Sequence, residues 1–239
     1  MQEKHISSAF DRDLEQLQAL VMKMGGLVET SIHEAVDALI NSDEELAIKL
    51  RKADKVIDAL EQDVNEKAAR LIALRQPVAG DLRTVLTVMK IAGNLERCGD
   101  YTKNLAKRTT ALVQMTPVNE AGPAIRRMAR EVEMMLKDAL DAYIQRDVEL
   151  AQATRLRDHD VDQMYNALFR ELLTHMMEDP RNISACMHLH FIAKNMERMG
   201  DHVTSIAEQV IYLVTGEMPE DPRPKGDSTS YNAVSELPE

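Results

Sequence analysis

The sequence predicts an all-α protein built as a tandem repeat of two three-helix bundles, six long helices in all. Hydrophobic residues make up 44% of the 239 residues, but aromatic residues make up only 3%, tryptophan is absent and methionine occurs 15 times. Strands are usually rich in aromatic and β-branched residues, whereas leucine, alanine, methionine and the long charged residues favour helices. In addition, the motif NLERCGD at 94–100 recurs as NMERMGD at 195–201. A repeat at this distance is far longer than a helical period and indicates a duplicated domain.

Apolar periodicity and turn residues predict two helices at the start of the chain. Apolar residues at spacings of three and four predict a first helix over residues 7–40. Gly25 and Gly26 interrupt this pattern, and we interpret them as a point of close helix packing. Ser42, at the head of a capping-box pattern, is the expected N-cap of a second helix that continues to about residue 74.

A third helix and a linker complete the predicted first half. The loop around Pro77 precedes Asp81, which is the expected N-cap of a helix that continues to about residue 115. Residues 116–123 contain two prolines and a glycine, so they form the expected linker after a first domain of residues 1–115.

The second half is expected to repeat the helix order of the first. The predicted second domain covers residues 124–215, and Pro180 precedes its third helix as Pro77 precedes the third helix of the first domain. Beyond residue 215 the apolar period ends and Gly, Pro, Asp, Glu and Ser dominate, which predicts a disordered tail over 216–239. The three helices of this domain are predicted over 124–144, 148–177 and 183–215.

Charge and cysteine content restrict the class of protein. The formal net charge of −11 argues against a general nucleic-acid binder, which needs a basic surface. Cys98 and Cys186 lie within helical patterns and show no CxxC spacing, as expected in a reducing compartment. No apolar stretch approaches the roughly 20 residues that span a bilayer. We therefore expect a cytoplasmic protein.

The acids of the repeated motif are the candidate functional residues. A helical projection of 100° per residue places Glu96, Asp100 and Asn104 in line with an apolar row that begins at Leu82 and Leu86. Carboxylates in line with a buried row are costly unless they are paired or bind a metal ion. Carboxylates four residues apart on a helix lie close enough to share a cation. The projection therefore predicts a cation site on this helix.

The second copy of the motif is related to the first but differs at several positions. Glu197 and Asp201 match the two acids of the first copy, and Ser205 stands where Asn104 would fall. Lys194 lies three residues before Glu197 and could neutralise it directly. His190 is a possible additional ligand, although a lone histidine is more often packed in a core or at its rim. We expect the first site to hold a metal ion more firmly.

Two interpretations of these acids remain open at the level of sequence. Oxygen ligands suit hard cations such as Mg²⁺, Ca²⁺ and Mn²⁺, and carboxylate clusters also bind iron. The matched acids Asp58 and Asp162, in the second helix of each half, are candidates to complete the sites. Alternatively, the acids form ion pairs with Arg97, Arg198 or another helix.

No sequence pattern of a catalytic site is present. The chain lacks a phosphate-binding glycine loop, GxSxG, HExxH, a cysteine–histidine nucleophile pattern and the Glu-x-x-His motif of di-iron bundles. We therefore predict a protein that is not an enzyme, with no catalytic or organic-cofactor site. The alternative is a metal-dependent hydrolase or oxidase that uses the paired carboxylates.

Several motifs together resemble the PhoU family over about residues 5–215. They are DLR at 81–83, KIA at 90–92, the two ER-x-GD segments, MGGLVE at 24–29, QP at 76–77 and MMED at 176–179. The resemblance implies two related three-helix bundles, a homodimer, and metal ions (iron, zinc, manganese or magnesium) bound at ExxxDxxxN/D motifs. Ser205 departs from the usual asparagine or aspartate. The implied metal ligands are Glu96, Asp100, Asn104, Glu197 and Asp201.

The same resemblance implies a function in phosphate homeostasis. Members of the family negatively regulate the phosphate (Pho) regulon and modulate phosphate uptake. They are thought to connect PstB, the ATPase of the phosphate ABC transporter, with the sensor histidine kinase PhoR. This implies a protein that reaches the membrane only peripherally, through its partners. We place the expected partner surface near Arg97 and Arg198.

Overall fold

The computed structural model describes residues 8–118 and 121–219, and within them it contains helices and no strand. This confirms the predicted fold class. Of the predicted tail, residues 220–239 lie outside the described residues. No helix in the described ranges is long and apolar enough to span a bilayer. The elements are α1 (Ser8–Ile40), α2 (Glu44–Arg75), α3 (Ala79–Leu112), α4 (Ala121–Gln145), α5 (Val148–Glu178), the short 3-10 helix η1 (Pro180–Asn182) and α6 (Ile183–Thr215).

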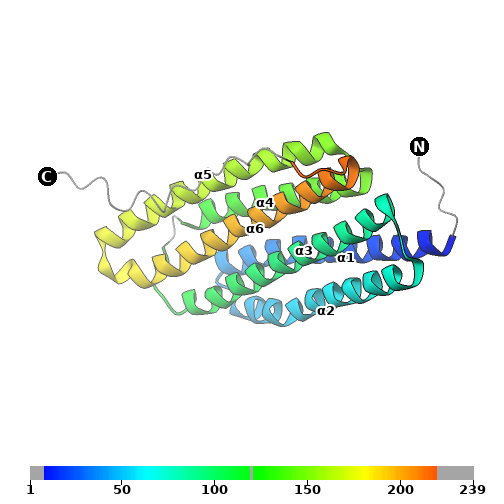
Figure 1. The fold of residues 1–239 in the computed structure, drawn as a ribbon. Coiled ribbons are helices and arrows are strands. Elements are labelled where there is room, and N and C mark those ends of the chain that lie inside the picture. Colours follow the sequence, from blue (N-terminus) through cyan, green and yellow to red (C-terminus); the bar gives the residue numbers. More distant parts are fainter. Residues whose placement is uncertain (1–7, 119–120, 220–239) are drawn as a thin grey trace.

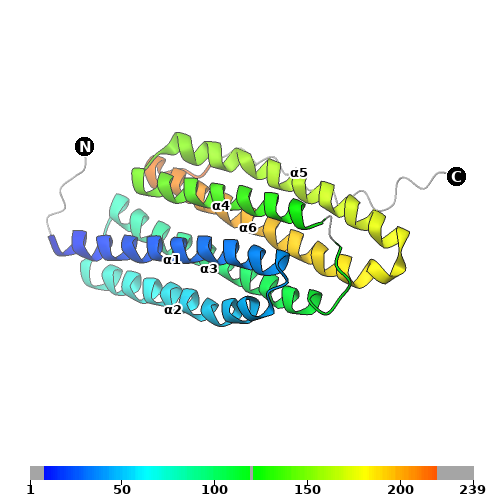
Figure 2. The same ribbon diagram turned by 180° about the vertical axis from the view of Figure 1, so that it is seen from behind.

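The helices pack as two bundles that share one interface. Helices α1, α2 and α3 contact one another, as do α4, α5 and α6, and the two bundles meet through α3 with α6 and α1 with α4. Figure 1 shows α3 and α6 side by side and antiparallel across one face, and Figure 2 shows α1 and α4 on the opposite face. Helices α2 and α5 lie at opposite edges and, in the described chain, pack only within their own bundle.

Burial of apolar side chains holds the bundles together. In α1 the predicted row is buried, because residues three and four apart lie on one side of a helix. Buried residues of both bundles form one continuous core. Gly25 is buried, and a Cβ built on it would collide with Leu140 Cδ1 of α4, whereas a Cβ on Gly26 would meet no atom of the described residues within 4 Å. Only the first of the two glycines therefore marks the expected close packing. The α1 row comprises Leu17, Val21, Met24, Val28 and Ile32.

The start of α2 differs from the sequence-based expectation. The N-cap is Asp43 rather than Ser42: the Asp43 carboxylate accepts a hydrogen bond of 2.9 Å from the backbone N–H of Leu46. Ser42 instead occupies the left-handed region with φ of 53° and belongs to the turn. Asp147 caps α5 in the same way, through a bond from the N–H of Leu150, so the two bundles repeat this feature.

Three other helix ends differ by a few residues. Helix α3 begins at Ala79 after Val78, so Asp81 lies inside its first turn, where a carboxylate favours the positive end of the helix dipole. The same helix ends at Leu112 rather than near residue 115. Helix α4 begins at Ala121 and includes Pro123, which is tolerated because the first turn of a helix leaves N–H groups without helical partners.

Replacing the observed cap of α2 is expected to destabilise the protein. Asp43→Ala should lower the free energy of unfolding by about 1 kcal/mol, because the N–H of Leu46 loses its acceptor. Ser42→Ala, at the neighbouring position, is a matched control and should change the free energy of unfolding by less than about 0.5 kcal/mol. Urea unfolding followed by circular dichroism measures both. An equal loss in the two variants would contradict the assignment of Asp43 as the cap.

Candidate functional site

The projection predicted that the acids of α3 lie in line with the buried face of the helix, but in the structure they do not. The core face lies on the opposite side, where a stronger apolar row is buried, and Leu86 of the expected row is 40% exposed. Glu96 and Asp100 are half-buried because they lie beside α2, and Asn104 is exposed. The expectation that these acids extend a buried row is therefore wrong. The buried row comprises Val85, Val88, Ile91, Leu95 and Leu105.

Four carboxylates from α2 and α3 form a first acidic cluster: Asp54, Asp58, Glu96 and Asp100. Asp54 is only 5% exposed, and its carboxylate accepts a hydrogen bond from the ammonium group of Lys103. The same Lys103 nitrogen lies 2.7 Å from Asp100 Oδ1. The cluster therefore already holds one cation, the side chain of Lys103, between its two helices.

The electrostatics of the first cluster show an excess of negative charge. Burial raises the pKa of Asp54 above its usual range, although the Lys103 ammonium opposes this. Burial, followed by the charge of Asp100, raises the pKa of Glu96, to which Asp58 also contributes. Asp54 Oδ1 is buried, and none of the residues that the structure describes gives it a hydrogen bond. An orphaned buried carboxylate oxygen is costly and favours a second cation.

A second cluster occupies the equivalent place in the other bundle, between α5 and α6. It comprises Asp158, Asp162, Glu197 and Asp201. Glu197 is 7% exposed, and burial is the main cause that raises its pKa, with the charges of Asp201 and Asp162 adding to the effect. Lys194 Nζ lies 2.9 Å from Glu197 Oε1, which confirms the expected neutralisation. Glu197 Oε2 is buried and has no hydrogen-bond partner in the described part of the chain.

A glycine on the third helix of each bundle allows the buried aspartate of the second helix to approach. A Cβ on Gly99 would lie 3.3 Å from Asp54 Oδ1, and a Cβ on Gly200 would lie 3.0 Å from Asp158 Oδ1. The glycine of the ER-x-GD motif therefore leaves space for the aspartate that approaches from the neighbouring helix. Each copy of the motif therefore supplies two acids of its cluster and the glycine that leaves room for an aspartate of the neighbouring helix.

The two clusters differ in the origin of their lysine. Lys103 follows the first motif, whereas Lys194 precedes the second, so the two ammonium groups enter from non-equivalent positions. Of the two lysines, only Lys194 was predicted from the sequence. Asp58 and Asp162 were predicted there as further ligands, but Asp54 and Asp158 are the more buried acids of these two helices. A spacing of four residues separates the two aspartates in α2 and the two in α5, as it separates the two acids of the repeated motif. This shared spacing could have identified both aspartates of each pair.

Other predicted residues lie at the margin of the clusters or outside them. Ser205 donates its hydroxyl to the backbone carbonyl of Asp201, at 3.0 Å, and His190 packs its ring near Phe169 and Tyr165. Arg97 lies 3.5 Å from Glu96 and 3.6 Å from Asp100. Ion pairing therefore accounts for part of the acidic charge. Among the described residues, no three His, Cys, Asp or Glu side chains stand together in the geometry of a metal site.

The raised pKa of Glu197 predicts a pH dependence of stability. The folded state holds the proton of Glu197 more tightly than the unfolded chain, in which the pKa is near 4.5. Stability from this group is therefore full below pH 4.5 and is lost as pH rises through the folded pKa. As pH rises above 4.5, we expect the stability of Glu197→Gln to decrease less steeply than that of the unsubstituted protein.

Urea unfolding at several pH values measures this effect, and Glu15→Gln provides a control because Glu15 is exposed on α1. The control should retain the slope of the unsubstituted protein. If Glu197→Gln also retains that dependence of stability on pH, burial of Glu197 is not the cause of the dependence.

The fold and the two clusters define a class of protein: an all-α tandem repeat in which each three-helix bundle carries the same four-carboxylate cluster. The PhoU domain family model matches residues 21–109 and 125–210, one match in each bundle. The chain therefore belongs to the PhoU family.

Curated relatives and solved structures are similar over nearly the whole chain. The "Phosphate-specific transport system accessory protein PhoU homolog" of Rhizobium meliloti is 46% identical over 96% of this chain and 97% of its own. The protein of the same name from Zymomonas mobilis is 49% identical over 92% of this chain and 93% of its own. The crystal structure of PhoU from Pseudomonas aeruginosa superposes with a TM-score of 0.83 at 38% identity, covering 87% of this chain and 100% of that one.

Proposed function

We propose that the protein is an accessory regulator of a phosphate-specific transport system that negatively regulates the Pho regulon and modulates phosphate uptake. In this role it acts as an adaptor between the transporter ATPase PstB and the sensor histidine kinase PhoR. The observation that supports the proposal is the similarity, over both bundles and both clusters, to proteins named as accessories of phosphate-specific transport. The related structure from Streptococcus pneumoniae, described as a phosphate transport system regulatory protein, has a TM-score of 0.80 at 30% identity over 88% of this chain.

Deleting the gene tests the regulatory role. In high phosphate, where the regulon is normally repressed, a deletion strain should express alkaline phosphatase, and a plasmid copy of the gene should restore repression. Phosphate uptake measured in the same strains reports on the transporter. A deletion strain that keeps alkaline phosphatase repressed would show that the regulatory assignment is wrong.

The remaining features of the proposal follow from the same role. The protein acts in the cytoplasm as a homodimer, meets the membrane only through its partners, binds no nucleic acid and catalyses no reaction. Its relatives are named as accessory and regulatory proteins, which favours an adaptor over a metal-dependent enzyme. Metal-dependent turnover of a phosphoester or of dioxygen by the purified protein would favour the enzyme instead.

We further propose that each acidic cluster binds a metal ion (iron, zinc, manganese or magnesium). The donor chemistry supports this proposal, because each cluster supplies carboxylate oxygens, and Asp54 Oδ1 and Glu197 Oε2 are buried with no hydrogen-bond partner among the described residues. Binding would have to draw the carboxylates closer together, since no three of them stand in the geometry of a metal site within the described chain. Glu96, Asp100, Glu197 and Asp201 would hold the ions together with the aspartates of α2 and α5. The exposed Asn104 is the weakest of the proposed ligands. A bound ion would supply positive charge that ties α2 to α3 and α5 to α6.

A further inference from the structure

We propose that the seam between α3 and α6 is a docking surface for an acidic helical segment of a partner protein. The proposal rests on the adaptor role above and specifies its surface. The seam lies along the middle of the face seen in Figure 1, between the two acidic clusters. We define it by Arg83, Lys90, Arg97 and Arg108 on α3 and by Phe191 and Arg198 on α6.

The seam is built by the two third helices of the bundles, which run antiparallel. Arg83 near the start of α3 lies 6.0 Å from the Tyr212 ring near the end of α6. At the centre, Cys98 Sγ lies 3.9 Å from the backbone carbonyl of Met199, its equivalent in the second motif. Equivalent residues of the two bundles therefore face each other across an approximate two-fold axis. This places Arg97 and Arg198 near the middle of the surface.

The cations of α3 form a row with a helical repeat. Arg83, Lys90 and Arg97 are seven residues apart, so they lie on one line at intervals of about 10.5 Å along the helix axis. A helix that lies along this row presents the same side every seven residues, and acids at that spacing would face the cations in turn. A row about 20 Å long cannot converge on one small anion such as phosphate.

The seam carries an excess of positive charge even though Arg97 pairs with Glu96 and Asp100, whereas the chain as a whole is acidic. Among the described residues, no carboxylate lies within ion-pairing distance of Lys90 or Arg198, both of which are exposed. Arg108 is desolvated, which lowers its pKa, and it stacks over the Phe191 ring at 4.2 Å. Arg83 Nε is buried and finds no hydrogen-bond partner among the described residues. The exposed Lys90 and Arg198 would gain from an anionic partner.

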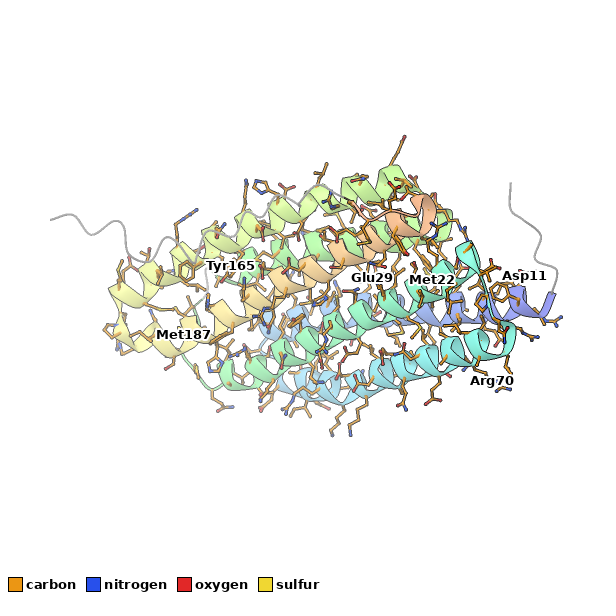
Figure 3. The ribbon with its side chains drawn as sticks, in the orientation of Figure 1. Asp11, Met22, Glu29, Arg70, Tyr165 and Met187 are labelled. Atoms are coloured by element: carbon orange, nitrogen blue, oxygen red, sulfur yellow. The ribbon has the colours of Figure 1, made fainter. Side chains whose placement is uncertain are left out.

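Exposed apolar side chains accompany the cations. Leu86 on α3 and Met187 on α6 occupy equivalent positions of the two bundles, and Phe191 is also exposed. Figure 3 labels Met187 near the start of α6, at one end of the seam. Cations interleaved with apolar groups fit an amphipathic acidic helix. A flat anionic membrane fits less well, because the acidic clusters beside the seam would repel it.

Binding of a synthetic probe tests the docking surface. The probe is a fluorescent alanine-based helix of about 20 residues with glutamate at every seventh position, measured by anisotropy with the full-length protein. We expect binding that weakens with rising salt and that becomes about tenfold or more weaker in the double variant Lys90→Glu, Arg198→Glu. The matched control, Lys52→Glu with Arg70→Glu on the exposed side of α2, should bind within about twofold of the unsubstituted protein.

Equal binding by the seam variant and the unsubstituted protein would overturn the proposal, as would equal losses in both double variants. Binding of inorganic phosphate or anionic phosphatidylglycerol vesicles at the seam without binding of the helix would also overturn it. Circular dichroism confirms that each variant is folded. The binding experiment and the gene deletion test different claims. Failure of the probe to bind would reject the docking surface but not the regulatory role. Continued repression of alkaline phosphatase in the deletion strain would reject the regulatory role but not binding at the seam.

Discussion

Lys103→Met is expected to lower the free energy of unfolding by about 2–4 kcal/mol at neutral pH. Lys103 supplies the cation between Asp54 of α2 and Asp100 of α3. Without it, the buried Asp54 carboxylate keeps its desolvation cost and loses its ion pair. Chemical denaturation at pH 7 and at pH 5 measures the effect, which should decrease at the lower pH because Asp54 then takes up a proton more readily.

Two variants separate this mechanism from a general effect of losing a lysine. Lys107→Met, one turn further along α3 and exposed, should change stability by less than about 0.5 kcal/mol. The double variant Asp54→Leu, Lys103→Met removes both charges and should recover much of the loss. A double variant no more stable than Lys103→Met would contradict the account of a paired buried carboxylate.

Gly200→Val is expected to destabilise the second bundle by about 2–3 kcal/mol. The new Cβ would lie 3.0 Å from Asp158 Oδ1 and 3.5 Å from Val161 Cγ1, both on α5, so α5 and α6 must separate or the aspartate must leave the cluster. The branched side chain adds further methyl groups to this close contact. Thermal unfolding followed by circular dichroism measures the loss.

Gly93→Ala, at a helical glycine of α3, is the control for this substitution. A Cβ on Gly93 would meet nothing within 4 Å, so alanine should stabilise α3 by up to about 1 kcal/mol through its better helix propensity. If Gly200→Val is as stable as the unsubstituted protein, the close approach of Asp158 does not restrict position 200.

The fold class could be predicted from the sequence because its determinants are local. Each helix and each loop can be recognised from its own stretch of sequence. The features that identify them are the scarcity of aromatic residues, the prolines between periodic segments and the recurring ER-x-GD motif. Helix ends were less certain, since Ser42 and Asp43 are both good N-caps and only the backbone conformation decides between them.

The clusters were only partly predictable because their halves come from different helices. Projection from Leu82 placed the acids on the wrong row of α3, since it followed the half-buried Leu82 and the exposed Leu86. The buried row passes through Ile91 and Leu95. The sequence identified Glu96 and Glu197 through the repeat. Whether Asp54 or Asp58 faces them depends on the rotation of α2 against α3, which is a property of tertiary packing.

The metal content of the purified protein, after incubation with Fe²⁺, Zn²⁺, Mn²⁺ or Mg²⁺ and removal of free ions, tests most directly whether the acidic clusters are cation sites. We expect bound metal that Asp100→Ala removes from the first cluster and Asp201→Ala from the second, so that the double variant binds none. Glu15→Ala, at an exposed position of α1, should retain the full metal content. Failure of the unsubstituted protein to bind any of these ions, or undiminished binding by the double variant, would contradict the assignment of the two acidic clusters as cation sites.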